Sequence, residues 1–378
     1  MIPLSVPNIN GNEWKYVKDC LDTGWISAVG SYVDKFEQTM AAYTGAKYAV
    51  AVANGTCALH LSCLLMNIQQ GDGVIVPDIT FIASVNSIKQ CGAEPILMDV
   101  NEQNWQMDLQ LLESFLSTDC EIINGICAIK KSKRKIKAIM PVHVLGHMCN
   151  MQKLKSIAIK FNLKVIEDAT EALGSTYKSK HAGTMGDIGC LSFNGNKIIS
   201  TGGGGVILTN NKEIAKLAKH LSTQAKTSPE EYIHDANGFN YRMVNILAAI
   251  GMAQMEQLPS FLHKKKDIAE QYHKKLNGVG DIQFIETEKN VVPNNWLFTI
   301  RTKKRKALFQ HLKNSGVQSR PLWQPMHMLA IHSKHLFVTK NNISTILYND
   351  CLSIPCSTDL KIKDQSIVIK KVVEFFST

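Results

Sequence analysis

The chain of 378 residues is too long for one small core, so we expect two domains, and its 45% hydrophobic and 20% charged content is typical of a globular protein. No apolar run could span a bilayer, residues 1–4 do not begin a signal peptide, and the ten scattered cysteines form no CxxC pair or zinc-type spacing, so we expect a reduced, cytoplasmic protein without a metal. The formal charge of +10 favours small anionic ligands, whereas nucleic-acid binding is disfavoured because we find no reading module and no basic stretch with interleaved aromatics.

Short apolar runs alternate with helical stretches through the first two thirds of the chain. This rhythm is typical of βαβ units around a mostly parallel sheet, in which ligands bind at the carboxyl ends of the strands. We expect strands at residues 47–53, 74–76, 95–100, 138–144, 164–166, 188–193 and 206–208, and helices from residue 54 to Gly71 and at 81–90, 109–116 and 151–161.

The pattern changes near residue 241, where one long amphipathic stretch begins and Pro259 is expected to kink or break it. Residues 297–300 and 367–376 are the clearest elements after it. The sequence therefore predicts a large domain at residues 1–240 and a smaller α+β domain at 241–378, which begins with a long linking helix.

Asn54-Gly55-Thr56 lies where a strand passes into a helix, so its backbone amides and the Thr56 hydroxyl are aimed at the sheet edge. A phosphate is favoured there. The alternative is an ordinary helix cap, which occurs in nearly every such unit, and on its own the motif favours the cap.

Asp168 follows the strand Val165-Ile166-Glu167, where a buried carboxylate is costly unless a cation meets it. A protonated pyridine nitrogen would be such a partner. A helix cap or a salt bridge would explain the residue equally well.

Lys197 lies in Leu191-Ser192-Phe193-Asn194-Gly195-Asn196-Lys197, between a strand and four glycines. An amine and the Ser192 hydroxyl in one short loop suit a phosphorylated aldehyde, since lysine is the usual side chain for imine chemistry. A surface lysine beside a glycine-rich turn is the plain alternative. Gly202 to Gly205 precede a strand rather than open a helix, which disfavours a nicotinamide enzyme.

Phe81 and His143 each follow an expected strand. Phe81 could lie flat on an aromatic ring, although such a residue more often belongs to the core. His143 could approach a cofactor or substrate, although a structural, hydrogen-bonded histidine is the more common case.

In this order, the motifs resemble the sugar-nucleotide aminotransferases of the DegT/StrS type, which have the aspartate aminotransferase-like α/β fold and use pyridoxal 5'-phosphate. The resemblance spans almost the whole chain. Its blocks are TGWISAVGSYVDKFE (23–37), NGTCALHL (54–61), PDITFIAS (77–84), PVHVLGH (141–147), IEDATEALGS (166–175), LSFNGNK (191–197), GFNYRMVNILAAIGMAQMEQL (238–258) and RPLWQPMH (320–327).

The resemblance implies a role for each matching position. Lys197 would bind the cofactor aldehyde and shuttle the proton, Asp168 would pair with the pyridine nitrogen, and Phe81 would stack on the ring. Gly55, Thr56 and Ser192 would hold the phosphate, and Asn240 would reach the phosphate of the neighbouring subunit, which implies a homodimer with shared active sites. The substrate side would include Trp25, His143, Arg320 and His327.

Two positions depart from the pattern of many family members. Glu171 stands where Gln or His is common beside the cofactor hydroxyl, so a proton is shared there or that contact differs, and Gly203 stands where an acid is common. With Gly195-Asn196-Lys197, these departures resemble the subgroup that aminates 4-keto-6-deoxy sugars, expected here to be UDP-linked, on the way to bacillosamine or legionaminic-type sugars. Glutamate is the expected amino donor.

Three competing functions remain at this level. A sugar dehydratase on the same fold would have histidine in place of Lys197, so the lysine counts against it. A non-catalytic regulatory protein on this fold and a nucleotide-binding protein without a cofactor are the other two, and both predict a protein that pyridoxal phosphate does not colour.

Overall fold

The computed structural model describes residues 1–27, 29–228 and 230–377; Ala28, in the first of the resembling blocks, Pro229 and Thr378 lie outside the described residues. In the described part, the main sheet has the strand order β1 (Tyr48–Val52), β11 (Gly205–Thr209), β10 (Ile188–Ser192), β7 (Lys164–Asp168), β6 (Ile136–Ile139), β2 (Gly73–Pro77), β3 (Glu94–Met98) and β16 (Phe337–Val338). Strand β11 runs antiparallel to both of its neighbours, and the strands from β10 to β16 pair in parallel. The expected α/β fold with a mostly parallel sheet is confirmed.

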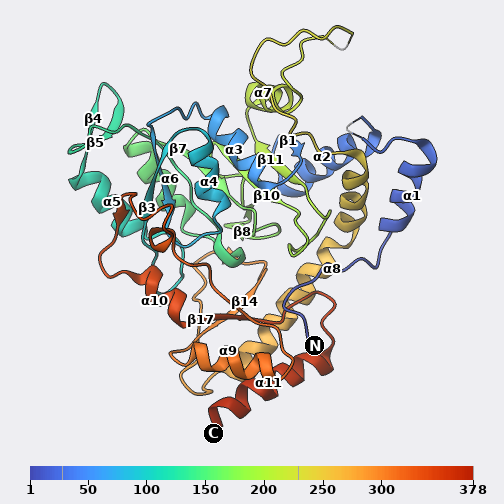
Figure 1. The fold of residues 1–378 in the computed structure, drawn as a ribbon, viewed down its shortest axis with the longest axis vertical. Coiled ribbons are helices and arrows are strands. Elements are labelled where there is room, and N and C mark those ends of the chain that lie inside the picture. Colours follow the sequence, from blue (N-terminus) through green and yellow to red (C-terminus); the bar gives the residue numbers. More distant parts are fainter. Residues whose placement is uncertain (28, 229, 378) are drawn as a thin grey trace.

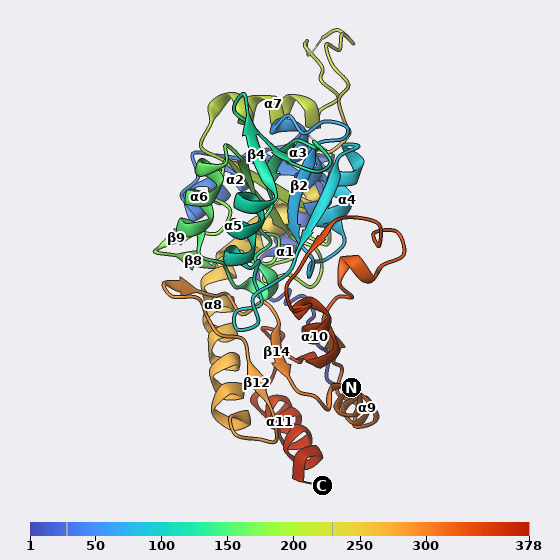
Figure 2. The same cartoon turned by 90° about the vertical axis from the view of Figure 1, so that its left-hand side faces the viewer.

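Helices cover this sheet on both sides (Figure 1, Figure 2). The strands are buried along nearly their whole length, as expected for a parallel sheet. The helices of this part are α1 (Glu13–Thr23), α2 (Ser31–Thr44), α3 (Gly55–Leu65), α4 (Ala83–Gln90), α5 (Leu109–Thr118), α6 (Met151–Lys160) and α7 (Lys212–Ser222), with the short 3-10 helix η1 (Val144–Gly146). A hairpin of β4 (Cys120–Ile123) and β5 (Ile126–Ile129) and a small sheet of β13 (Val291–Val292), β8 (Thr176–Tyr177) and β9 (Lys180–His181) flank it.

Helix α8 (Asn245–Leu276) runs from the large sheet down into the C-terminal part (Figure 1). It contains Pro259 but continues through it, so the expected break at this proline does not occur. Pro259 is exposed, while Leu258 and Phe261 on the opposite face stay buried. Burial of the surrounding face compensates for the hydrogen bond that the proline cannot donate.

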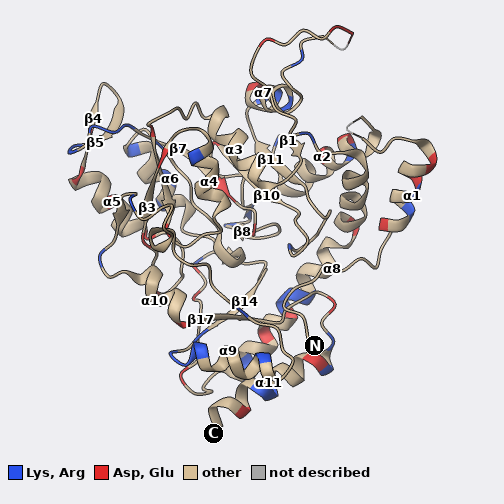
Figure 3. Ribbon diagram, in the orientation of Figure 1, with Lys and Arg blue, Asp and Glu red and all other residues tan. Residues whose placement is uncertain are grey.

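The C-terminal part has its own sheet, in the order β12 (Gln283–Phe284), β14 (Phe298–Arg301), β17 (Cys351–Ile354) and β15 (Arg320–Pro321). The helices α9 (Arg305–Asn314), α10 (Ile343–Asp350) and α11 (Ile362–Ser377) and the 3-10 helix η2 (Met326–Met328) belong to it. Figure 3 shows many Lys and Arg residues on α9, α11 and the end of α8, which gives this part a positive field. No helix among the described residues is long and apolar enough to cross a membrane.

Two segments connect the parts that the expected boundary at residue 240 would separate. The amide of Ile2 donates to Gly316, so the N-terminus lies on the C-terminal part. Conversely, Phe337 pairs with Leu97, which adds a strand from the C-terminal part to the large sheet. The division between residues 240 and 241 stays a prediction, and these two segments cross it.

The strand expected at residues 138–144 is shorter than predicted. Strand β6 ends at Ile139, and only the isolated bridge between Val142 and Asp168 continues the pairing. Pro141 has no amide hydrogen to donate, and Leu145 has the positive φ of 60°, so the chain turns away from the sheet here. This turn leads Leu145 to the cavity described next.

Candidate active site

A cavity of about 330 Å³ lies at the carboxyl ends of β2, β7 and β10, with the C-terminal part forming its far wall. The loops that follow parallel strands converge at this edge, as the fold dictates. Eight residues expected to be functional line it: Gly55, Thr56, Phe81, Asp168, Glu171, Ser192, Lys197 and Arg320.

The start of α3 forms a cradle at one end of the cavity. The Asn54 side chain accepts the amide of Cys57 at 2.8 Å and fixes this first turn, whose remaining amides point beyond the helix. Gly55 packs against Ser192 so closely that a Cβ atom on it would lie 2.8 Å from the Ser192 Cβ. Only glycine permits this close packing, which keeps the Ser192 hydroxyl beside the first amides of α3, and these groups together suit a phosphate.

Asp168 ends β7 and is buried in the cavity floor. Its Oδ2 accepts the Ser84 hydroxyl at 2.6 Å, and its Oδ1 accepts the Thr170 hydroxyl at 2.7 Å. These bonds fix the carboxylate in place, while the cavity offers it no arginine or lysine within salt-bridge distance among the described residues. A buried anion held in this way suits a cationic ring nitrogen.

Lys197 and Glu171 form a buried pair beside this acid. The Lys197 Nζ lies 4.0 Å from the Glu171 Oε1, and 14% and 3% of the two side chains are exposed. Burial lowers the pKa of Lys197, against the opposing attraction of Glu171 and Asp168. Burial also raises the pKa of Glu171 to about 7, although Lys197 and the Leu145 amide oppose it. Burial thus favours the neutral amine of Lys197 and the neutral carboxyl of Glu171.

Trp296 covers the other side of this amine. The Lys197 Nζ lies 4.1 Å from the centre of its ring, and the Trp296 Nε1 donates to the Asn196 carbonyl at 2.6 Å. The buried Lys265 donates to the Trp296 carbonyl at 2.8 Å. The ring of Trp323 stacks on Trp296 at 6.3 Å and 13°. Together the two tryptophans form a rigid aromatic wall.

The residues fit the expected pyridoxal phosphate. The cradle at the start of α3, where only glycine fits at position 55, matches its phosphate, Asp168 matches its ring nitrogen, and Lys197 is the one amine among the described residues that line the cavity. Phe81 is 54% exposed in an otherwise buried loop and faces this space rather than the core. Such exposure suits a ring that covers a flat ligand.

Four expected site residues lie outside the cavity. His143 is buried, and its Nε2 bonds the Glu167 carboxylate at 3.0 Å. Burial would raise the pKa of Glu167, but His143 and the amides of Gly183 and Gly186 lower it. His143 therefore stabilises the strand behind Asp168 instead of facing a substrate.

Trp25, Asn240 and His327 also do not line the cavity. Trp25 is exposed, and its carbonyl accepts the Asn245 side chain. Asn240 lies at the base of an arm of residues 224–228 and 230–238 that projects from the body in Figure 1 and Figure 2. The His327 Nδ1 lies 2.6 Å from Asp78, away from the cavity.

The sequence analysis missed Ser84, Thr170, Trp296 and Trp323. Ser84 and Thr170 bind Asp168, and their positions after β2 and β7, whose carboxyl ends lie at the same edge of the sheet, could have suggested them. Trp296 lies in a loop 128 residues after Asp168, and no local pattern connects it with Lys197.

Comparisons with known proteins show the family of the chain. Residues 7–373 match the DegT/DnrJ/EryC1/StrS aminotransferase family. Proteins named GDP-perosamine synthase from Escherichia coli O157:H7 and Caulobacter vibrioides are 39% and 38% identical over 100% and 97% of this chain and 99% and 96% of their own. Spr1654 of Streptococcus pneumoniae, solved in a PLP-form, superposes with a TM-score of 0.89 at 26% identity, over 100% of this chain and 98% of its own.

Proposed function

Since the chain belongs to the DegT/DnrJ/EryC1/StrS aminotransferase family, we propose that it transfers an amino group from L-glutamate to a nucleotide-linked 4-keto-6-deoxy sugar in the cytoplasm, for a surface polysaccharide or glycan. The chain is a pyridoxal phosphate-dependent sugar aminotransferase. The observation that carries the proposal is the buried Lys197 amine, set between Glu171 and Trp296 and above the fixed Asp168 carboxylate.

The names of the relatives bear on which nucleotide the sugar substrate carries. The departures at Glu171 and Gly203 favour a UDP-linked sugar, whereas the relatives at 37–39% identity carry a name that states a GDP-linked amino sugar. Because these relatives match along nearly the whole chain, we place GDP first and keep UDP as the alternative. Arg320 and the Trp323 ring, both on the far wall, are the groups available for an anionic, ring-bearing substrate.

Bound pyridoxal phosphate supplies an aldehyde and an electron-withdrawing ring that stabilises negative charge on the reacting carbon. Asp168 would pair with the ring nitrogen and favour its protonated form, and the α3 amides with Ser192 would hold the phosphate. Lys197 moves a proton on its Nζ, which requires the neutral amine, and burial favours that form. Glu171, 4.0 Å from this amine, acts on it through its charge, since the carboxylate favours the ammonium form.

Asn240 supports a homodimer with shared sites. It is exposed at the base of the projecting arm and does not line the cavity of its own chain. A residue of this kind can reach the phosphate cradle of a second copy, as the family resemblance implies. In a two-fold dimer each chain would then complete the site of the other.

The test is mass spectrometry of the product after the holoenzyme is incubated with glutamate and a panel of GDP-, UDP- and dTDP-linked 4-keto-6-deoxy sugars. The proposal requires the replacement of one carbonyl oxygen by an amine on a GDP-linked or, second, a UDP-linked sugar. Loss of water from the sugar without amination would instead support the dehydratase. A protein that pyridoxal phosphate does not colour would support a non-catalytic role.

A further inference from the structure

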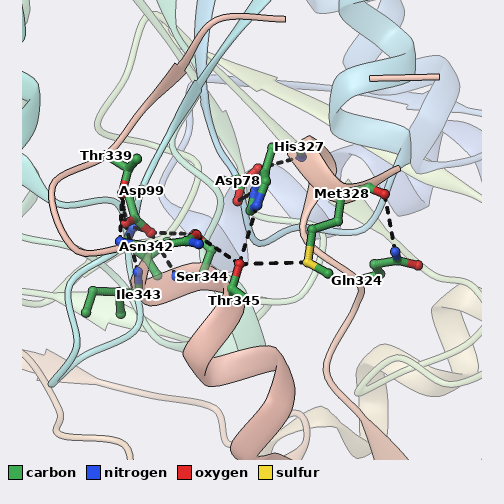
Figure 4. Close-up of polar contacts among 11 residues, drawn as sticks. Asp78, Asp99, Gln324, His327, Met328, Thr339, Asn342, Ile343, Ser344 and Thr345 are labelled. Atoms are coloured by element: carbon green, nitrogen blue, oxygen red, sulfur yellow. Dashed lines mark hydrogen bonds and ion pairs between the residues drawn. The ribbon is translucent and has the colours of Figure 1, made fainter. Parts of the chain in front are cut away.

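Residues 322–342, here called the strap, cross from the C-terminal part to the edge of the large sheet. The Phe337–Val338 strand pairs with β3, and the Leu97 amide donates to the Leu336 carbonyl at 2.8 Å. At its far end the Asp99 carboxylate accepts the Thr339 hydroxyl at 2.6 Å and the Ile343 amide at 2.9 Å (Figure 4). The strap is therefore anchored to the sheet where β3 ends.

The other anchor lies where β2 ends. Asp78 is buried, its carbonyl accepts the Met326 amide at 2.9 Å, and its carboxylate accepts the His327 amide at 2.9 Å and lies 2.6 Å from the His327 Nδ1 (Figure 4). Burial raises the pKa of Asp78, which His327 opposes. The carboxylate makes two of these bonds and the backbone carbonyl one, and together they fix the position of the turn at residues 326 and 327.

The His327 ring has neighbours on its other sides as well. It stacks on Phe337 with ring centres 4.2 Å apart and planes at 7°, and its Nε2 lies 3.4 Å from the Thr345 hydroxyl. Asp78, Phe337 and Thr345 together occupy both ring nitrogens and one face. The imidazole is thus held as a structural part, although its side chain is 20% exposed.

This contact joins two walls of the cavity. Asp78 precedes Thr80 and Phe81, which line the cavity by the cofactor cradle, and His327 follows Leu322 and Trp323, which line the opposite wall. The contact between Asp78 and His327 lies three residues before Phe81 and four residues after Trp323. It therefore sets the spacing between the two walls. A loosened contact would move the Trp323 wall directly, and it would reach the Lys197 amine only through the Trp296 ring that lies between them.

We propose that His327 is a positioning residue, which through Asp78 sets the Arg320–Trp323 wall for the nucleotide sugar and does not itself contact the substrate. The inference rests on the proposed function for its substrate. Because the amino donor is small and reacts at Lys197, the effect falls on the keto-sugar half of the reaction. The half that transfers the donor's amine to the cofactor stays unchanged.

The test compares His327→Ala with His327→Asn, since the Asn amide can donate near the position of Nδ1. We expect His327→Ala to raise the KM for the keto sugar about tenfold, as for one lost charged hydrogen bond. His327→Asn restores most of the wild-type value. The KM for glutamate, and the rate at which glutamate bleaches the visible absorbance of the holoenzyme, stay the same in both variants.

The matched control is His335→Ala, which removes a histidine of the same strap that also pairs with a carboxylate, Glu94, at 3.2 Å but lies far from the cavity wall along the chain. Hydrogen exchange at residues 78–84 and 322–328 gives a readout independent of activity. It should rise in His327→Ala and stay at the wild-type level in His335→Ala. If His327→Ala does not fold, His327→Gln, which displaces the donor, takes its place.

Three results would overturn the inference. Equal loss in His327→Asn and His327→Ala would mean that the ring contacts the substrate, and equal loss in both half-reactions would mean a general defect. Unchanged exchange at residues 322–328 would mean that the contact does not position the wall. A wild-type enzyme that aminates no sugar would refute the proposed function, and the exchange comparison would still decide the role of His327.

Discussion

Lys197 and Glu171 depend on each other for their charge. Burial disfavours the ammonium form of Lys197 and the carboxylate form of Glu171. The attraction between them at 4.0 Å offsets part of this effect for each group. With a Glu171 pKa of about 7, the carboxyl changes state near neutral pH, so above that pH it favours the Lys197 ammonium. A glutamine at this position could not act in this way, because an amide does not titrate.

Glu171→Gln should therefore make Lys197 a neutral amine at lower pH. Above pH 7 the wild-type carboxylate raises the pKa of the amine, and the variant lacks this effect. We expect the midpoint of Lys197 reactivity to move to lower pH, because the variant lacks the carboxylate that raises the pKa of the amine. Reductive methylation of the cofactor-free enzyme across pH, read at Lys197 by mass spectrometry, measures it. Glu213→Gln, which changes an exposed carboxylate, is the control; an identical midpoint in Glu171→Gln would show that the pair is not coupled.

Lys197→Ala should abolish amination but leave the cradle able to hold the cofactor in its amine form. We expect a fall in turnover of at least about a thousandfold, since both the proton carrier and the attachment point are lost. Affinity for pyridoxamine phosphate, measured by fluorescence titration, should change only a few-fold because Asp168 and Ser192 remain. Lys266→Ala, on the exposed face of α8, is the control. Retained turnover in Lys197→Ala would remove the basis of the proposed function.

At the scale of elements, the local units were predictable and their longer connections were not. The strand-to-helix step at Asn54 and the strand before Asp168 follow from short runs of sequence, so the positions of Gly55, Asp168 and Ser192 in one cavity could be foreseen. Helix α8 continues past Pro259 because the surrounding helix face is buried, and the general preference of proline for helix ends does not take such burial into account. The strap and the Trp296 wall come from residues 99 or more positions after Lys197, so only tertiary packing brings them to the site.

The start of α3 offers a test of the cradle. Gly55→Ala places a methyl group 2.8 Å from the Ser192 Cβ, so it must displace the Ser192 side chain that we propose to hold the phosphate. We expect the affinity for pyridoxamine phosphate to fall about tenfold or more while the circular dichroism spectrum stays native. Gly195→Ala is the matched control, because its Cβ would meet no atom within 4 Å although it lies two residues from Lys197. Equal affinities in the two variants would place the phosphate elsewhere.

At the scale of the whole molecule, the site is formed by both parts of the chain, because the cofactor cradle belongs to the large sheet and Trp296 and Arg320 to the C-terminal part. The strap and the N-terminal segment cross between the parts and hold them together. The positive charge of the C-terminal part adds an attraction for an anionic nucleotide sugar. We therefore expect the KM for this substrate to rise with ionic strength, because salt screens the attraction. The turnover number at saturating substrate should change little. Steady-state assays over a salt series would measure both.

A mixing experiment decides whether two copies share their sites. If Asn240 serves the partner's cradle, a dimer of one Lys197→Ala chain and one Asn240→Ala chain has both defects in one site and none in the other. Random mixing makes about half of the dimers mixed, with about half of their sites intact, so activity should return to about a quarter of the wild-type value. Each variant alone, carried through the same unfolding and refolding, is the control. If Asn240 instead served its own chain, every site of the mixed dimer would carry one defect, and activity after mixing would stay at the level of the separate variants.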